Sequence, residues 1–411
     1  MRLLVQKFGG TSVQTSENRK FVIQKIKEAI EEQYKVVVVV SALGRNPDPY
    51  ATDTLVSLVD EPKTANEKRE LDLLMSCGEV ISSTVLANEL RREQINAIAL
   101  TGAQAGLITT NDFTEAKIRQ VKPERVKQEL KTVDVVVIAG FQGRTEDGDM
   151  TTIGRGGSDT SAAAFGATLQ AEYVDIFTDV DGIMTADPRV VESAQAIDVV
   201  TYTEIANLAH QGAKVVHPRA VEIAMQAEIP LRIRSTYSDK YGTLITASRA
   251  DYVGVDIPDR LVTGIAHIED ISQMKISVPE SEHDAPAKVF TAMADADISV
   301  DFITITPTEI TYTVPNKLAS YAVELLSEFQ YGVTVLPDCA KVSAVGAGMA
   351  GIPGVAAKIT KALAKEGVQI LQSADSHTTI WVLVKESEVK KAVNALHEAF
   401  ELNKLNEAKQ S

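Results

Sequence analysis

Short apolar runs alternate with longer amphipathic stretches over the first 245 of the 411 residues. The apolar runs are continuous, which is typical of parallel strands that helices cover on both faces. A strand followed by a helix, repeated along the chain, predicts an α/β fold with a doubly wound sheet. The predicted strands are residues 3–5, 36–40, 133–139 and 174–178, and the clearest predicted helices are 18–33 and 158–170.

Small residues follow several of these predicted strands. Gly9 and Gly10 come after the first, Ser41 after the second, and Gly140 after a later one. In open α/β sheets, ligands bind beyond the carboxyl ends of the strands, where bare backbone can approach them. The pattern therefore predicts one crevice that these strand ends share.

The pattern changes after residues 246–261, which contain glycine, proline and charges and are predicted to form a linker. Residues 288–300 match residues 358–370 without a gap. A short predicted strand, 275–278 or 341–345, precedes each copy. Strand, turn, helix and strand, twice over, predict two ferredoxin-like βαββαβ modules. We expect a catalytic domain over 1–245 and modules over 262–338 and 339–411.

The formal charge is −15, so nucleic acids and anionic membranes are unsuitable partners for the chain as a whole. No apolar run approaches the roughly 20 residues that span a bilayer, and no signal-peptide core is visible near the start. We expect a soluble, cytoplasmic protein. Cys77 and Cys339 lack the spacing of a disulfide framework or a metal site, and both are predicted to be buried thiols.

The first candidate for chemistry is Lys7-Phe8-Gly9-Gly10, at the end of the first predicted strand. Glycines there leave backbone N–H groups free to point at phosphate oxygens, and the lysine can neutralise their charge. The lysine precedes the glycines, so this is not a Walker loop. A tight turn with a surface lysine is the alternative.

The second candidate, residues 154–159, lies just before a predicted helix. Glycines before a helix N-terminus create an anion pocket, and the planar guanidinium of Arg155 suits a carboxylate or phosphate. Ser158 or Asp159 can cap the helix. Asp159 would repel an anion unless it pairs with Lys7 or organises a metal. A flexible glycine turn is the alternative.

Other candidates carry weaker signals. Thr178 and Asp179 begin a polar loop after a buried strand, but Asp-Gly and Asp-Pro pairs in that loop are ordinary turn formers. Arg189 and Lys214 are candidates for polyphosphate, with a solvated face as the alternative for each. Glu79 is either a polar-face residue of a helix or an acceptor for an ammonium group.

Residues 346–351 form a G-x-G-x-x-G pattern after a strand, followed by Asp375, which is typical of dinucleotide binding. Only 36 residues remain after Asp375, too few for the rest of such a domain. The other copy of the repeat also lacks the glycines. We therefore interpret this segment as a loop at the interface of a regulatory module.

Taken together, these motifs resemble the aspartokinases, within the amino acid kinase superfamily. The resemblance covers nearly the whole chain, and the C-terminal repeat resembles the paired ACT domains of that family. The matching motifs are residues 7–13, 154–159, 178–182 and 217–220.

The resemblance implies ATP- and Mg²⁺-dependent phosphorylation of the β-carboxylate of L-aspartate to 4-phospho-L-aspartate. This is the first step toward diaminopimelate, lysine, methionine and threonine. It implies that Lys7, organised by Asp159, neutralises phosphoryl charge, that Arg155 binds the α-carboxylate and that Glu79 binds the ammonium group. Gly156, Gly157 and Ser158 would also line the substrate site, and the nucleotide side would comprise Phe8, Gly9, Gly10, Ser41, Thr178, Asp179, Arg189 and Lys214. No metal ligand from the protein is assigned.

Two segments depart from the family pattern. Residues 45–51 are inserted before Thr52, the substrate-loop candidate. Residues 373–379 replace a motif common in lysine-sensitive members, which favours meso-diaminopimelate over lysine or threonine as feedback effector. The predicted effector site includes Asp284, Gly348 and Asp375. Paired ACT domains also imply a homodimer.

Two alternatives stay open. Another amino acid kinase, acting on glutamate or acetylglutamate, generally lacks a tandem ACT pair, so the repeat favours the aspartokinase. A catalytically inactive amino-acid sensor would not need Lys7, Arg155 and Asp159 together.

Overall fold

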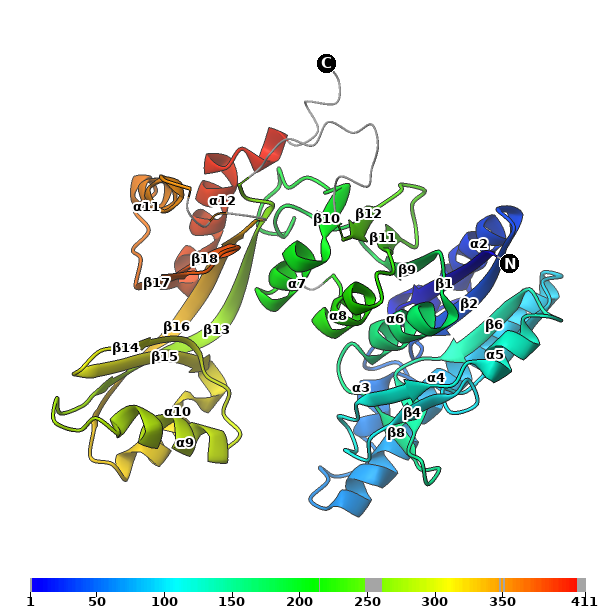
Figure 1. Ribbon diagram of the computed structural model, residues 1–411, viewed down its shortest axis with the longest axis horizontal. Coiled ribbons are helices and arrows are strands. Elements are labelled where there is room, and N and C mark those ends of the chain that lie inside the picture. Colours follow the sequence, from blue (N-terminus) through cyan, green and yellow to red (C-terminus); the bar gives the residue numbers. More distant parts are fainter. Residues whose placement is uncertain (1, 214, 248–260, 347–348, 350–351, 405–411) are drawn as a thin grey trace. The chain divides into compact units, whose positions relative to one another are not determined.

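The computed structural model describes residues 2–213, 215–247, 261–346, 349 and 352–404. The chain divides into two compact units, which are described separately (Figure 1). The first unit comprises Met1–Ile183, Ala196–Ala209 and Lys214–Ile257, and the second comprises Met184–Gln195, His210–Ala213 and Pro258–Ser411.

An eight-stranded sheet forms the centre of the first unit, in the order β10-β12-β11-β9-β1-β2-β6-β3. Its neighbouring strands are parallel except for the pair β11 and β12. The strands are β1 (Arg2–Phe8), β2 (Tyr34–Val40), β3 (Ala97–Leu100), β6 (Val135–Ala139), β9 (Tyr173–Thr178), β10 (Val199–Thr201), β11 (Leu231–Ser235) and β12 (Thr243–Thr246). The predicted α/β fold with a mostly parallel sheet is confirmed.

Helices cover both faces of this sheet, as continuous apolar strands require. On one face, α2 and α4 bury side chains such as Ile26 and Leu86 against Phe8 and Val38. On the other face, α6 packs against β1, β2 and β9. The helices are α1 (Gly10–Val13), α2 (Ser16–Glu31), α3 (Thr52–Val56), α4 (Ala65–Arg92), α5 (Glu124–Glu129), α6 (Gly157–Leu169), α7 (Tyr202–His210) and α8 (Pro218–Gln226).

A second, four-stranded sheet in the same unit has the order β5-β4-β7-β8. Its strands are β4 (Leu107–Thr109), β5 (Ile118–Val121), β7 (Gln142–Arg144) and β8 (Met150–Thr152). The buried Gln142 donates from Nε2 to the backbone oxygen of Ser76, 2.8 Å away, and so ties β7 to α4. This small sheet leads directly into the glycine-rich segment 154–159.

The second unit contains an antiparallel six-stranded sheet in the order β14-β15-β13-β16-β18-β17. Its strands are β13 (Gly264–Ser277), β14 (Asp301–Ile305), β15 (Glu309–Pro315), β16 (Gly332–Val345), β17 (Gln372–Asp375) and β18 (Thr379–Lys385). Helices α9 (Ala285–Asp295) and α10 (Asn316–Ser327) pack on β13 and β15, whereas α11 (Val355–Lys365) and α12 (Val389–Ala399) pack on β16 and β18 (Figure 1). This is the predicted pair of βαββαβ modules.

The two modules are interleaved along the chain. Strands β13 and β16 are both 14 residues long and pair over nearly their whole length. The second half of β13 opens the first module, whereas its first half pairs with the part of β16 that opens the second module. The fourth strand of the second module therefore precedes the first module in sequence. The predicted modules, 262–338 and 339–411, are continuous in sequence, whereas in the structure the second module takes one strand, the first half of β13, from the sequence range of the first.

Two stretches from the catalytic part of the sequence belong to the second unit. Residues Met184–Gln195 follow β9 in the chain, and Thr185 in this stretch makes a 2.8 Å hydrogen bond with the buried His397 of α12. Residues His210–Ala213 lie between α7 and α8, and Gln211 accepts a 2.8 Å hydrogen bond from Trp381 Nε1. The predicted domain over 1–245 thus contributes residues to both units.

Two smaller predictions have different outcomes. Cys339 is buried, but Cys77 is exposed, so the prediction for Cys77 was wrong. Cys77 lies one turn from the exposed Leu73 on α4, away from the buried Asp72 and Glu79. None of the described helices is long and apolar enough to cross a membrane. Most of the predicted linker lies outside the described residues.

Candidate functional site

Lys7 and Asp159 form an ion pair at the end of β1. Residues alternate in direction along a strand, so Phe8 faces α2 and Lys7 faces α6. Lys7 Nζ lies 2.7 Å from Asp159 Oδ1, and each side chain is 13% exposed. No hydrogen bond links Asp159 Oδ1 to any other group among the described residues. The predicted pairing of Asp159 with Lys7 is therefore present, and a partly exposed ammonium group stands at the sheet edge.

The glycines after β1 allow two strand ends to meet. A Cβ on Gly10 would lie 2.7 Å from the backbone oxygens of both Ala42 and Gly44. The Gly10 oxygen accepts from Gly44 N at 3.0 Å, and Ser41 N donates to the Phe8 oxygen at 3.2 Å. A Cβ on Gly9 would meet only Lys7 Nζ, at 3.6 Å. Gly10 is thus required for packing, whereas Gly9 leaves open backbone beside the lysine.

The segment 154–159 forms the entry to α6. Gly156 is the N-cap with φ +67°, and a Cβ there would lie 2.1–2.4 Å from atoms of His217. No side chain caps the helix, so the predicted capping by Ser158 or Asp159 was wrong. Ser158 instead accepts a 3.0 Å hydrogen bond from Ser41 Oγ, and Asp159 pairs with Lys7. Both side chains point to the neighbouring strand ends and are unavailable to the helix terminus.

Arg155 is exposed and makes no ion pair or hydrogen bond within the part of the chain that the structure describes. The glycines on both sides of it, Gly154 with φ +74° and Gly156 with φ +67°, adopt the left-handed conformation. An exposed guanidinium beside a helix N-terminus suits an anionic ligand.

Glu79 is buried in α4 and reaches the end of β2. Its Oε1 accepts from Ala42 N at 3.0 Å, whereas its Oε2 has no hydrogen-bond partner in the described parts of the chain. Burial raises the pKa of Glu79 to about 8, although the backbone hydrogen bonds act against the rise. A Cβ on Gly78 would lie 2.8 Å from Ala42 Cβ, so the glycine lets α4 approach this loop. The buried, unpartnered oxygen can accept from a ligand cation.

The remaining predicted residues are more scattered. Thr52 begins α3, whose Leu55 lies near Gly78 of α4. Thr178 closes β9 and donates to the Asp179 carboxylate at 3.1 Å. Arg189 belongs to the second unit and lies 2.6 Å from the Asp187 carboxylate. Lys214 lies outside the described residues.

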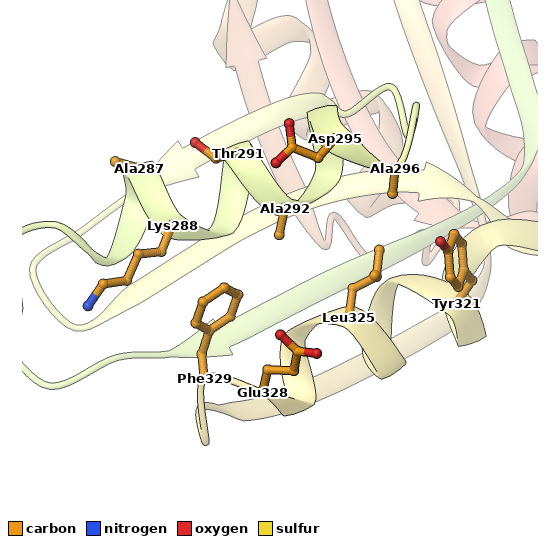
Figure 2. Close-up of a pocket in the computed structure, with 10 residues that line it drawn as sticks. All are labelled: Ala287, Lys288, Thr291, Ala292, Asp295, Ala296, Tyr321, Leu325, Glu328 and Phe329. Atoms are coloured by element: carbon orange, nitrogen blue, oxygen red, sulfur yellow. The ribbon is translucent and has the colours of Figure 1, made fainter.

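The predicted effector residues all belong to the second unit. Asp284 precedes α9 and lies 3.1 Å from Lys288 Nζ. Asp375 ends β17 and is exposed, and Gly348 lies outside the described residues. Lys288 also lines a groove of about 610 Å³ between α9 and α10, opposite Phe329 (Figure 2). Because Lys288 lines the groove and pairs with Asp284, Asp284 lies beside the groove.

Two residues of the first unit had no predicted role in the site. His217, part of the matching motif 217–220, packs against Gly156, and its backbone N–H donates to Asp159 Oδ2 at 3.4 Å, so it borders the site. Asp72, fully buried on α4, accepts from Thr114 N and Thr152 N. Its spacing of seven residues from Glu79, which places both on one helix face, was the available signal.

The described residues contain no cluster of three or more metal-ligating side chains. Mg²⁺ in nucleotide sites is held largely by phosphates and water, with one or two carboxylates. Asp159 and Asp179, at the ends of α6 and β9, are suitable carboxylates for such shared binding. The residues fit a metal that arrives with the nucleotide.

Comparisons with known proteins show the family to which the chain belongs. The model of the amino acid kinase family matches residues 2–235, and an ACT domain model matches residues 334–398. Aspartokinase 1 of Bacillus subtilis (strain 168) is 58% identical over 404 residues, which are 98% of this chain and 100% of that protein.

Solved structures show the same fold. The aspartate kinase of Clostridium acetobutylicum has a TM-score of 0.78 and 25% identity, over 97% of this chain and 100% of that one. E. coli aspartokinase III, solved with aspartate and ADP, has a TM-score of 0.77 and 24% identity, over 97% and 99%. The chain belongs to the aspartokinases, within the amino acid kinase family.

Proposed function

We propose that the chain transfers the γ-phosphoryl group of ATP to the β-carboxylate of L-aspartate, giving 4-phospho-L-aspartate and ADP. The Lys7–Asp159 pair carries this proposal, because it holds a partly exposed ammonium group beside open glycine backbone at the sheet edge. The 58% identity to an aspartokinase over nearly the whole chain supports aspartate as the acceptor.

The proposed chemistry needs no general base. A carboxylate with an ordinary pKa near ~3.9 is already ionised at neutral pH. Phosphoryl transfer then depends on holding the two reactants in line and on neutralising the charge of the transferred group. Lys7 supplies that charge, and Asp159 keeps its ammonium in place at 2.7 Å.

On the acceptor side, we assign the α-carboxylate of aspartate to Arg155 and the ammonium group to Glu79. The exposed guanidinium, which has no ion pair or hydrogen bond to the described residues, supports the first assignment. The buried Oε2 without a hydrogen-bond partner supports the second. Thr52, Gly156, Gly157 and Ser158 complete the proposed acceptor side.

On the donor side, we assign the ATP phosphates to Lys7 and to the backbone of Phe8, Gly9 and Gly10. Ser41, Thr178 and Asp179 lie at neighbouring strand ends and are assigned to the nucleotide, as are Arg189 and Lys214. Mg²⁺, bound with the phosphates, would supply further neutralisation of charge.

We further propose feedback control through the second unit, with meso-diaminopimelate favoured as effector over lysine or threonine. Residues 373–379 and the candidates Asp284, Gly348 and Asp375 support this choice on sequence grounds. The homodimer, the cytoplasmic location and the place at the head of diaminopimelate, lysine, threonine and methionine biosynthesis also stay proposals.

The direct test is ADP release from ATP with aspartate, glutamate or acetylglutamate as acceptor. We expect turnover with aspartate to exceed turnover with the other two by orders of magnitude. Preference for glutamate or acetylglutamate would replace this proposal with the other amino acid kinase activity. No turnover with any acceptor would favour an inactive sensor.

Replacing Lys7 with alanine separates catalysis from sensing. Lys7→Ala is expected to reduce kcat by roughly 10²–10³-fold, the usual effect of removing one group that stabilises transition-state charge. Binding of meso-diaminopimelate, measured by calorimetry, should be unchanged. Full turnover in this variant would contradict the assignment of Lys7.

A further inference from the structure

Asp72 is a fully buried carboxylate that no proposed step of the reaction uses. Its Oδ2 accepts from Thr152 N at 2.9 Å, and its Oδ1 accepts from Thr152 Oγ1 at 2.6 Å. Both oxygens also lie 3.0 Å from Thr114 N. No cation neutralises Asp72 among the described residues, so these three donors alone satisfy its charge. A buried charge held in this way is costly to disturb.

The donors belong to two segments that meet beside the Arg155 loop. Thr152 ends β8, three residues before Arg155. Thr114 has φ +75°, an unusual conformation for a β-branched residue, and a Cβ on Gly154 would lie 3.5 Å from its oxygen. Ala116 N donates to the Thr152 oxygen at 3.0 Å and completes the contact. Asp72 thus fixes both the approach to Arg155 and the segment packed against it.

A guanidinium holds the same segments through their carbonyls. Arg219 of α8 donates from Nη1 to the Ile153 oxygen at 3.1 Å and from Nη2 to the Ala116 oxygen at 3.4 Å. The strand that leads into the Arg155 loop therefore lies between a buried acceptor on α4 and a donor on α8. Arg155 makes no such contact with any residue that the structure describes, so its position depends on this strand.

Asp72 and Glu79 share one face of α4. Seven residues are nearly two helical turns, a rise of about 10.5 Å. One position on this rigid helix holds the chain before Arg155, and the other presents the buried Oε2 of Glu79. The helix thereby connects the backbone that leads to Arg155 with the residue that presents Glu79 Oε2.

We infer that Asp72 is a positioning residue, which sets Arg155 at the correct distance from Glu79 to recognise the α-amino acid end of the substrate. This inference rests on the proposed function and assigns the selectivity for the α-carboxylate of aspartate to the position of Arg155. Asp72 is fully buried and accepts hydrogen bonds from Thr114 and Thr152. Its effect should therefore act through the Arg155 loop, on aspartate binding and selectivity.

The test compares Asp72→Asn with wild type in steady-state kinetics. The amide keeps the shape of the side chain but turns one acceptor into a donor that faces backbone N–H groups. We expect the KM for aspartate to rise about 10- to 100-fold. This is the effect expected when Arg155 is misplaced by roughly 1 Å. The KM for ATP should stay within about twofold.

A second measurement uses the α-amide of aspartate as the acceptor. A misplaced Arg155 no longer distinguishes the α-carboxylate from the neutral amide. The ratio of kcat/KM for aspartate to that for the amide should therefore fall at least tenfold in Asp72→Asn. Thr152→Ser, which keeps both donors to Asp72, should retain the wild-type ratio. Thr152→Val loses the hydroxyl donor and should give an intermediate ratio, which can be measured even if Asp72→Asn fails to fold.

The matched control is Leu86→Ala, a buried position on the same helix that is packed in the core cluster. It should lower the melting temperature and leave the selectivity ratio unchanged. An unchanged ratio in both Asp72→Asn and Thr152→Val would overturn the inference while the proposed function stands. A wild-type enzyme that does not phosphorylate aspartate would overturn both.

Discussion

A single buried oxygen explains much of the proposed recognition of aspartate. Glu79 Oε2 lies in the interior without a partner, and burial raises the pKa of this carboxyl to about 8. We therefore expect the Glu79 carboxyl to be mostly protonated at pH 7 before aspartate binds. An ammonium group placed beside Oε2 would favour the ionised form and lower the pKa again.

Aspartate binding at pH 7 should therefore release close to one proton. Affinity should rise about tenfold per pH unit as pH approaches 8, and then level off, because deprotonation costs progressively less. Calorimetry in two buffers of different ionisation enthalpy measures the release. Glu79→Gln should bind weakly and release none; proton release in that variant would contradict the assignment.

The proposed aspartate site also depends on how closely the ends of strands and the starts of helices approach one another. Gly156 combines φ +67° with a close approach to the ring of His217. Gly148 has φ +99°, but a Cβ there would meet nothing within 4 Å. A side chain at Gly156 would meet both backbone strain and a steric clash, whereas a side chain at Gly148 would meet backbone strain alone. Substitutions at the two positions therefore distinguish the two effects.

Gly156→Ala is expected to reduce kcat/KM for aspartate by at least about 100-fold, because the loop that carries Arg155 must move away from His217. Gly148→Ala carries the strain alone, on the order of 1–2 kcal/mol, and should keep its activity. Steady-state kinetics and thermal unfolding of both variants test this. Equal activities would show that contact with His217 does not set the loop.

A buried ionic cluster lies on the face of the eight-stranded sheet that α2 covers. Asp175 on β9 is fully buried and accepts from Arg232 at 2.6 and 2.9 Å, with Arg234 at 3.3 Å. Burial acts against the charge of Arg232, but the adjacent Asp175 raises its pKa above the ordinary value. The cluster fixes β9 to β11.

Asp175→Leu should lower the free energy of unfolding by about 3 kcal/mol, because it leaves two partly buried guanidinium groups without the Asp175 carboxylate. The double variant Asp175→Leu, Arg232→Met should be less destabilised than the single variant. Urea unfolding of the single and double variants measures the difference. A single variant as stable as wild type would show that the cluster is solvated.

Sequence patterns predicted the elements better than their contacts. Continuous apolar runs indicated the parallel strands, and the glycines after them indicated a shared edge, where Gly10 does meet Ala42 and Gly44. Capping by Ser158 or Asp159 was a local expectation, and tertiary contacts with Ser41 and Lys7 override it. Local rules describe what a side chain can do, whereas neighbouring strands decide which partner it takes.

At the scale of the whole molecule, no local signal revealed the exchange of segments. The repeat indicated two modules, but the pairing of β13 with β16 is a long-range contact that leaves no pattern in either strand. The stretches around Thr185 and Gln211 likewise lie within the predicted catalytic sequence yet belong to the second unit. The chain therefore passes from the first unit into the second after β9, and again between α7 and α8.

Gln211 offers a test of this connection, because it accepts from Trp381, the single tryptophan of the chain. Gln211→Ala should keep turnover without effector but raise the half-inhibitory effector concentration about fivefold or more. Titration of meso-diaminopimelate, lysine and threonine, with tryptophan emission and ADP release as readouts, measures the change. Unaltered inhibition would show that this contact carries no coupling.

If the Lys7–Asp159 site phosphorylates the β-carboxylate of aspartate, the product is an acyl phosphate. Hydroxylamine traps an acyl phosphate as a stable hydroxamate, which mass spectrometry and chromatography against both isomers can identify. Incubation of the enzyme with ATP, Mg²⁺, aspartate and hydroxylamine should give aspartate β-hydroxamate with wild type and almost none with Lys7→Ala. The α-isomer, or equal β-hydroxamate from Lys7→Ala, would contradict the account.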